Sequence, residues 1–441
     1  AEELNLELPI QVSLEPLFEP LILGTKKLSN RLAVQPMEGC DGKRDGSPAE
    51  LTFRRYRRYA EGGSGLIWFE ATSVVERGRS NPHQLLIQAK NLDCFKRLVE
   101  LARSSAQQAS GNSHQIFLVL QLTHSGRYSK PHGTPEPQAA CPNHLLDEKK
   151  AGLHVLSDDE LCRLEERYVE AAGLAWRAGF DAVDIKACHG YLVNELLSAR
   201  TRKNSRYGGS FEKRNLFLRQ VLRRIKEDIP QIFLAVRLSA YDGLPFPHGF
   251  GVSEDDQVRI DLTEPKSLVK LLIELGCSLF NITAGNPHLK PHLGRPFDRP
   301  LLDAPLPEEH PLEGVCRLIS ITHELQRSYP ETAFVGSGYS WLRHFFPYVG
   351  AAVVAQKMAS LIGLGRSSFA YPDAPRDLLQ KNSLDPKKTC LACSRCSQLL
   401  RSGRVAGCVI RDREVYGREY KKLASRLKTP GGKNEDEDGQ D

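Results

Sequence analysis

The chain has 441 residues, of which 40% are hydrophobic and 26% are charged, and its formal net charge is +6. These proportions are typical of a soluble protein with a large core, and they exclude fibrous and low-complexity classes. No stretch approaches the roughly 18 uninterrupted apolar residues of a membrane span, and the N-terminus lacks a signal-peptide pattern. The basic residues are scattered rather than interleaved with aromatic ones, which argues against a nucleic-acid partner. We therefore expect a cytosolic protein that contacts neither membrane nor nucleic acid.

Short apolar runs rich in β-branched residues alternate along the chain with longer segments of helical periodicity. Eight runs are predicted as strands: residues 31–37, 66–74, 116–124, 182–187, 232–239, 279–284, 332–336 and 359–364. Helical patterns lie between them, at residues 48–61, 92–108, 157–178, 211–227, 264–275, 312–328 and 341–356. Strands that alternate with helices in this way predict a parallel (β/α)₈ barrel rather than a doubly wound sheet.

Two long connections interrupt this repeat, at residues 125–155 and 240–263. They follow the third and fifth predicted strands, so they should lie at the C-terminal rim of the barrel, where active sites of this fold are found. We assign residues 1–380 to the barrel, 381–425 to a cysteine-rich extension, and 426–441 to an acidic tail too polar to fold.

Four of the eleven cysteines cluster near the C-terminus, as Cys390-x2-Cys393-x2-Cys396-x11-Cys408. In a reducing compartment, four cysteines at such spacing predict a metal site rather than disulfides. The spacing permits either a structural Zn²⁺ or a [4Fe–4S] cluster, because both accept four thiolates.

Polar motifs stand at the predicted strand ends. In chain order they are NRLAVQPM (30–37), QLTHSGR (121–127), HGYLVNELL (189–197), YGGSFEKR (207–214) and VRLS (236–239). Together they resemble the old yellow enzyme family of flavin oxidoreductases over residues 17–375. The cysteines that follow narrow the resemblance to the branch that contains 2,4-dienoyl-CoA reductase and trimethylamine dehydrogenase, whose members carry an iron–sulfur cluster at almost the same spacing.

The resemblance implies an FMN ring over the mouth of the barrel. Gln121 and Arg237 match the family's donors to the ring, with the arginine near N1, where negative charge gathers on reduction. Without the resemblance, Arg237 would be read as part of a core salt bridge, since a buried arginine needs a partner. Pro36, Met37 and Ala71 match the contacts along the other edge of the ring.

Glu38 would lie beside the flavin C4 carbonyl, where relatives often have threonine, cysteine or histidine. There it could tune the flavin potential; a salt bridge to Arg54 or another loop cation is the alternative. The FMN phosphate would lie beyond the seventh and eighth strands, at Gly338, Gly365 and Arg366, where barrels commonly bind phosphate. From spacing alone, a glycine after a strand is more often only a turn.

Tyr191 matches the family's proton donor, although a buried tyrosine at a strand end is otherwise usually core packing. Lys186 and His189 stand where many relatives hold a substrate carbonyl between two histidines or a histidine and an asparagine, so Lys186 departs from the pattern. His288 aligns with a pocket histidine of the iron–sulfur branch; a surface loop histidine is the alternative. We expect His124 to support the loop rather than to take part in chemistry.

These assignments predict an enzyme that reduces an activated carbon–carbon double bond of a small molecule, with hydride from flavin N5 and a proton from Tyr191. An oxidative amine dehydrogenase is the first alternative, but it would need clustered aromatic residues, which three tryptophans do not suggest. A non-catalytic electron-transfer flavoprotein is the second. No GxGxxG motif follows a strand after Cys408, so electrons should come from NAD(P)H directly or from a separate donor protein. The arginines at 395, 401, 404, 411 and 413 would suit an acidic donor.

Overall fold

The computed structural model describes residues 2–147, 152–256, 258–301 and 304–428. Eight parallel strands form a closed barrel, paired in the order β10-β11-β12-β3-β4-β5-β8-β9. They are β3 Leu32–Val34, β4 Leu66–Ser73, β5 Phe117–Thr123, β8 Ala182–Ala187, β9 Phe233–Ser239, β10 Cys277–Thr283, β11 Ala333–Gly336 and β12 Leu361–Leu364. Each predicted strand contributes one of them, so the (β/α)₈ prediction is confirmed.

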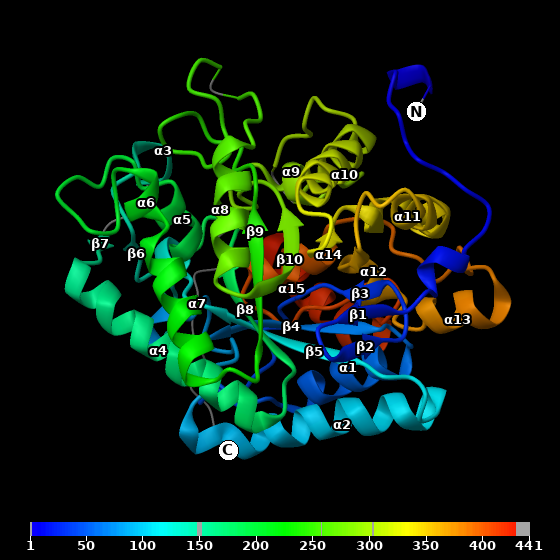
Figure 1. The fold of residues 1–441 in the computed structure, drawn as a ribbon. Helices are drawn as coiled ribbons and strands as arrows, with labels where there is room; N and C mark the ends of the chain where they lie inside the picture. Colours follow the sequence, from blue (N-terminus) through cyan, green and yellow to red (C-terminus); the bar gives the residue numbers. More distant parts are fainter. Residues whose placement is uncertain (1, 148–151, 257, 302–303, 429–441) are drawn as a thin grey trace.

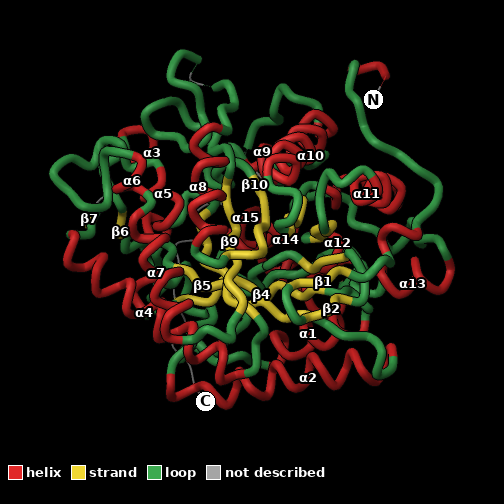
Figure 2. The backbone as a smooth tube through the Cα atoms, viewed as in Figure 1, coloured by secondary structure: helices red, strands yellow, loops and turns green. Residues whose placement is uncertain are grey.

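Helices surround the strands, which gather at the centre of the molecule (Figures 1 and 2). The principal ones are α1 Glu50–Glu61, α2 Leu92–Ser110, α4 Asp158–Ala178, α7 Leu216–Asp228, α8 Thr263–Glu274, α10 Pro311–Ser328 and α11 Phe346–Ala355. Helix α4 shows how local sequence sets a boundary. The Ser157 hydroxyl accepts from the Glu160 amide at 3.2 Å, and the Glu160 carboxylate accepts from the Ser157 amide at 2.8 Å. This reciprocal cap satisfies two amides that the first turn leaves unpaired.

Three elements differ from the prediction for identifiable reasons. Strand β3 ends at Val34 rather than at residue 37, and Pro36, which lacks an amide hydrogen, cannot continue the ladder. The predicted helix 211–227 is interrupted at Asn215, which separates α6 Phe211–Arg214 from α7. The predicted helix 341–356 begins only at Phe346, because Tyr339–Phe345 is a 3₁₀ segment in which Arg343 has a positive φ of 55°.

The barrel interior has two layers of opposite character. The N-terminal layer is apolar and is closed from below by the hairpin of β1 Leu21–Leu23 and β2 Lys26–Leu28. Its buried members are Leu23, Leu28, Ala33, Leu66, Trp68, Phe117, Val119, Ala182, Ala235, Leu279, Ala333, Val335 and Leu361. The C-terminal layer is polar and consists of Gln35, Gln121, Asp184, Arg237 and Asn281, all buried. The polar layer places the chemistry at the C-terminal mouth, as barrels of this kind do.

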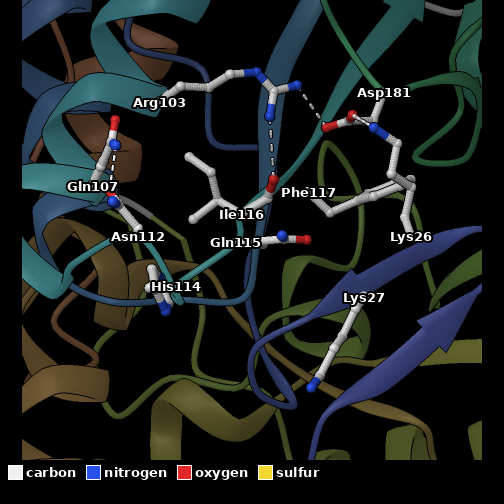
Figure 3. Close-up of a pocket in the computed structure, with 10 residues that line it drawn as sticks. All are labelled: Lys26, Lys27, Arg103, Gln107, Asn112, His114, Gln115, Ile116, Phe117 and Asp181. Atoms are coloured by element: carbon white, nitrogen blue, oxygen red, sulfur yellow. Dashed lines mark hydrogen bonds and ion pairs between the residues drawn. The ribbon is translucent and has the colours of Figure 1, made fainter.

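A pocket of about 310 Å³ lies at the opposite, N-terminal end (Figure 3). It is lined by residues of the β1–β2 hairpin and of the starts of β5 and β8. Asp181 forms ion pairs with Lys26 at 3.3 Å and with Arg103 at 2.9 Å. Both cations share this one carboxylate, which ties the β1–β2 hairpin and α2 to the start of β8, so we assign the pair a structural role.

After α12 Arg366–Ala370, the chain continues through α13 Ala374–Lys381, α14 Arg395–Arg401, the π-helical turn Arg413–Gly417 and α15 Arg418–Lys428. A small core holds these elements together: Leu399, Ala406, Val409, Tyr416 and Leu423. Helix α15 runs past residue 426, where the tail was expected to begin, and residues 429–441 lie outside the described residues. No helix in the described ranges is long and apolar enough to cross a membrane.

Asp412 fastens this C-terminal segment to the barrel. Its side chain is 7% exposed and accepts from Arg54 and Arg58 of α1, each at 2.7 Å.

Asp412→Asn should lower the free energy of unfolding by about 1–3 kcal/mol, because charged hydrogen bonds to two arginines are lost. Urea unfolding and the rate of proteolysis within residues 381–428 measure the change. Asp93→Asn, in the exposed pair with Lys96, is the control and should stay within about 0.5 kcal/mol of wild type. Equal effects of the two substitutions would contradict this role for Asp412.

Candidate active site

One carboxylate organises the polar layer of the barrel. Asp184 on β8 accepts from the Gln121 side-chain amide at 2.6 Å, the Trp68 indole at 2.8 Å and the backbone amide of Arg237 at 2.5 Å. Burial raises the pKa of Asp184 to about 6. The carboxylate thereby fixes Gln121 and the strand that carries Arg237, the two residues predicted to face the flavin ring. Neither Asp184 nor Trp68 was among the predicted site residues.

Arg237 forms no ion pair with any described residue, so the structure does not support the core salt bridge that was its alternative. The residue is 8% exposed, and its Nε is buried without a hydrogen-bond partner. Burial lowers the pKa of the guanidinium. A buried cation without a counter-ion is costly unless a ligand supplies acceptors or negative charge. The site therefore fits a group that gathers negative charge at this place.

The first strand enters the site through a crowded turn. Gln35 donates to the Ser337 hydroxyl at 3.2 Å and accepts from the Asn281 amide at 2.7 Å. A Cβ on Gly363 would lie 2.0 Å from the Gln35 amide nitrogen, so only glycine fits there. Pro36 is buried, and Met37 and Glu38 are half-buried as the chain leaves β3.

Ala71 lies in β4 between Phe69 and Thr72, where the register of β4 against β5 shifts. The irregularity interrupts the regular ladder, which makes this backbone available for contacts other than strand pairing. Ala71 is nevertheless buried, and its carbonyl accepts from Gln84 at 3.2 Å.

The predicted phosphate residues lie together beyond β11 and β12. Gly338 has a φ of 99°, in the left-handed region, and a Cβ on it would meet Leu318 at 2.9 Å. Gly365 precedes Arg366, which is 5% exposed. Arg366 donates from Nη2 to the Pro296 carbonyl at 2.6 Å, while its Nη1 is buried without a partner. The unpartnered nitrogen fits an anionic ligand.

Above the polar layer, Tyr191, Lys186 and Glu38 form a compact cluster. The ammonium of Lys186 lies 3.7 Å from the centre of the Tyr191 ring and 3.4 Å from the Glu38 carboxylate. Glu38 also accepts from the Ser80 hydroxyl at 3.1 Å. The cation that pairs with Glu38 is therefore Lys186 of strand β8, and not a loop cation. Arg54, the partner proposed from the sequence, is wrong because it is bound to Asp412.

His189 stands beside this cluster on a strained turn. Its φ is 66° and that of Gly190 is 72°, a conformation rare for a histidine and typical of functional sites. Its amide donates to the Ser239 hydroxyl at 3.2 Å, and its Nε2 lies 3.4 Å from the Thr283 hydroxyl. A Cβ on Gly190 would meet Asn286 at 2.3 Å, which explains the glycine of the HGYL motif.

Burial sets the protonation states of these residues. It raises the pKa of Tyr191 well above its ordinary value, and Glu38 raises it further. Burial lowers the pKa of His189 well below 6.5, and nearby Arg237 and Lys186 add to this. Burial also lowers the pKa of Lys186, against the opposing influence of Glu38. At neutral pH, Tyr191 therefore keeps its proton and His189 is neutral.

Three aromatic rings meet at the mouth. The ring of Tyr128 stacks on that of His288 with centroids 3.6 Å apart, and Tyr191 lies 6.0 Å from the first and 6.4 Å from the second. His288 is exposed to solvent on the loop after β10, and its ring lies against Tyr128 and beside Tyr191. The expectation that clustered aromatics are missing is therefore wrong, and Tyr128, like Asp184 and Trp68, is a residue that sequence reasoning overlooked.

Several motif residues support the site from outside it. Buried Arg127 forms ion pairs with Glu195 and Asp147, which joins the QLTHSGR loop to the HGYLVNELL helix. Arg214 of the YGGSFEKR motif pairs with Glu264 at 2.5 Å. His124 accepts from the Gly126 amide at 3.0 Å, and burial lowers its pKa to about 4, so it is a neutral loop support, as expected.

The four clustered cysteines are free thiols, and each is close enough to another to influence its ionisation. The Ala392 amide donates to the Cys390 sulfur and the Arg411 amide to the Cys408 sulfur, both at 3.4 Å. Cys396 and Cys408 also pack against the barrel core. Over the described ranges, however, no three or more histidine, cysteine, aspartate or glutamate side chains are gathered tightly enough to hold a metal ion.

The sequence profile of the NADH:flavin oxidoreductase / NADH oxidase family matches residues 16–259. An NADPH dehydrogenase of Geobacillus thermodenitrificans is 32% identical over 275 residues, which cover 61% of this chain and 73% of that protein. The chain belongs to this family. An NADH oxidase of Thermoanaerobacter brockii is 27% identical over 86% of this chain, which spans about half (52%) of that protein's length.

Solved structures show the same fold. A 2-naphthoyl-CoA reductase matches with a TM-score of 0.73 at 18% identity, over 92% of this chain and 58% of that one. An old yellow enzyme homologue from Zymomonas mobilis matches with a TM-score of 0.63 at 22% identity, over 90% of this chain and 98% of that one. Histamine dehydrogenase from Rhizobium sp. 4-9 matches with a TM-score of 0.67 at 20% identity, over 91% of this chain and 53% of that one.

The Lys186–Glu38 pair should behave as one buried unit. Glu38→Gln and Lys186→Met should each destabilise the fold by about 1–3 kcal/mol, because each leaves one charge unpaired, and the double variant should lose less than the sum. Folding lowers the pKa of Lys186 below 10.5, so stability rises with pH between the folded and unfolded values. Glu38→Gln removes the neighbouring carboxylate and lowers the folded pKa of Lys186 further. The stability of this variant should therefore begin to rise at a lower pH than that of wild type. Urea unfolding from pH 6 to 10 tests this; additive effects with unchanged pH profiles would show that the pair is not coupled.

Proposed function

We propose that the chain is an FMN-dependent reductase of activated carbon–carbon double bonds. The observation that carries this proposal is that Arg237, buried and without an ion pair among the described residues, is the register partner of Lys186, whose ammonium lies over the buried Tyr191 ring. Pro36, Met37, Glu38, Ala71, Gln121 and Arg237 would hold the ring, and Gly338, Gly365 and Arg366 the phosphate. Bound FMN would supply hydride, with NAD(P)H or a donor protein as the source of electrons.

The residues above the polar layer would bind and protonate the substrate. Lys186 and His189 offer donors to an activating carbonyl, and the positive charge of Lys186 would favour a substrate whose carbonyl oxygen gains negative charge as hydride arrives. Tyr191 would hold the proton that the α-carbon receives, and its raised pKa keeps that proton in place at neutral pH. His288 would form the wall of the pocket with Tyr128.

The aromatic cluster brings amine oxidation back as a second candidate, since cationic ligands bind over aromatic faces. Lys186 argues against it, because its ammonium already lies 3.7 Å from the Tyr191 ring centre and would repel an amine. Turnover with a panel of enones, enoyl thioesters and primary to tertiary amines distinguishes the two functions.

Tyr191→Phe should leave FMN bound and reducible but slow its reoxidation by an alkene about 10²–10⁴-fold, the usual contribution of a general acid. Stopped-flow absorbance of the oxidative half-reaction measures this. Tyr128→Phe keeps the ring that stacks on His288 and should slow the step less. An unchanged rate in Tyr191→Phe would exclude it as the proton donor.

We further propose a [4Fe–4S] cluster at Cys390, Cys393, Cys396 and Cys408. The support comes from the four-thiol donor set, the two backbone amides that donate to sulfur, and the resemblance to the iron–sulfur branch. A structural zinc ion is the alternative. Iron and acid-labile sulfide content, with the visible spectrum of anaerobically purified protein, separates the two.

A cytosolic electron-donor protein would then dock near the cysteines. Of the arginines considered for docking, Arg404 pairs with Glu419 at 3.2 Å and Arg395 lies over the Tyr420 ring. Arg401 and Arg413 are exposed and are the better candidates for an acidic partner.

Cys393→Ser should abolish turnover with a reduced protein donor while leaving any direct NAD(P)H turnover nearly unchanged, because only the first route needs the cluster. Both assays should be run at equal FMN content. Cys94→Ser on α2 is the matched control and should affect neither route. The external-donor hypothesis would be contradicted if wild type and Cys393→Ser reduce the substrate equally fast with NAD(P)H and neither turns over with the reduced donor protein.

A further inference from the structure

The loop of residues 295–299 joins the predicted phosphate site to the cysteine segment. On one side, its Pro296 carbonyl accepts from Arg366 at 2.6 Å. On the other side, the Asp298 amide donates to the Ala392 carbonyl at 3.2 Å, and the Ser394 hydroxyl donates to the Arg299 carbonyl at 2.7 Å. The loop therefore contacts both places where anionic groups are proposed to bind.

Arg295 is the first residue of this loop and carries a positive charge. Its guanidinium donates to the Ser397 hydroxyl at 2.6 Å and to the Ser394 hydroxyl at 3.4 Å, beside Cys396 and Cys393. No described carboxylate forms an ion pair with it. The two hydroxyls hold the side chain in place, but they leave its charge uncompensated.

Two further arginines share this region. Burial, followed by the nearby charge of Arg366, lowers the pKa of Arg295 to about 9, and Arg401 lowers it too. The groups that act in the opposite direction are the thiols of Cys396 and Cys390. Arg366 is buried and Arg295 is half-buried, while Arg401 is exposed beside them, and like charges that are partly removed from water are unfavourable unless anions lie among them. The proposed function supplies two such anions, the flavin phosphate and the cysteine thiolates with their cluster.

We propose that Arg295 is a positioning residue shared by both sites, whose positive charge strengthens binding of the flavin phosphate and raises the reduction potential of the cluster. This inference rests on the proposed function, because it requires FMN and a redox-active cluster. A positive charge near a cluster favours the reduced form, which carries one more negative charge. The same charge attracts a phosphate beside Arg366.

The experiment compares Arg295→Gln, which keeps a hydrogen-bond donor for the serines but removes the charge, with Arg295→Lys, which keeps the charge. Arg299→Gln is the matched control, since that side chain is exposed on the same loop. FMN and riboflavin affinities are measured by flavin fluorescence, and the cluster potential by anaerobic spectroelectrochemical titration.

Arg295→Gln should weaken FMN binding about 10-fold, in keeping with one partly screened charge, and should leave riboflavin binding unchanged. Its cluster potential should move to more negative values, and Arg295→Lys should restore most of both properties. If Arg295→Gln loses the metal, FMN affinity is compared between Cys393→Ser and the Cys393→Ser/Arg295→Gln pair, where the same 10-fold loss is expected. Wild-type values for FMN affinity and potential in Arg295→Gln would overturn the inference. Failure of the wild-type protein to bind FMN or iron would refute the proposed function instead.

Discussion

The buried carboxylate of Asp184 is the interaction on which the mouth of the barrel depends. Below it, the strands are filled with apolar side chains that exclude water, so the three donors around Asp184 have no competing solvent. Three hydrogen bonds to one carboxylate fix an indole, a side-chain amide and a backbone amide from three neighbouring strands. The carboxylate lies near Arg237 but forms no ion pair with it, which leaves the guanidinium available to a ligand. A neutral residue at position 184 would hold neither Gln121 nor the β9 backbone in the same way.

On the substrate side of the site the buried cation has an ion-pair partner, whereas Arg237 in the polar layer has none among the described residues. Relatives in the old yellow enzyme family commonly present two neutral donors where this chain has Lys186 and His189. A lysine brings a full charge into a buried place, and Glu38 supplies the compensating charge. Glu38 follows Met37 on the loop that leaves β3, beside the proposed flavin edge, and Lys186 lies beside the proposed substrate. The ion pair between them therefore joins the flavin side of the site to the substrate side. Any substrate that binds Lys186 must therefore also alter the surroundings of Glu38.

The barrel could be predicted from sequence because its signal is local. Apolar runs of strand length alternate with helical periodicity, and this pattern survives small errors at element ends. Tyr191 and His189 could be proposed from the sequence because they lie within one contiguous motif. Asp184 was missed, although it alternates with Lys186 along a strand that otherwise consists of apolar residues, which was a usable signal. Arg295 and Ser397 are 102 residues apart, and no periodicity connects a loop to a segment so distant in sequence. Tyr128 directly follows a motif but becomes significant only through its stacking on His288.

The C-terminal segment packs against the loops that form the mouth of the barrel. The Ala406 amide donates to the carbonyl of Gly39, the neighbour of Glu38, at 2.7 Å. Arg401 donates to the carbonyl of Pro287, the neighbour of His288. Residues 295–299 connect the same segment to Arg366. The cysteine segment thus contacts three loops, and these loops carry the proposed flavin edge, the pocket wall and the phosphate arginine. A ligand that orders the four cysteines would therefore bind next to all three loops, in a segment that is packed against the mouth of the barrel.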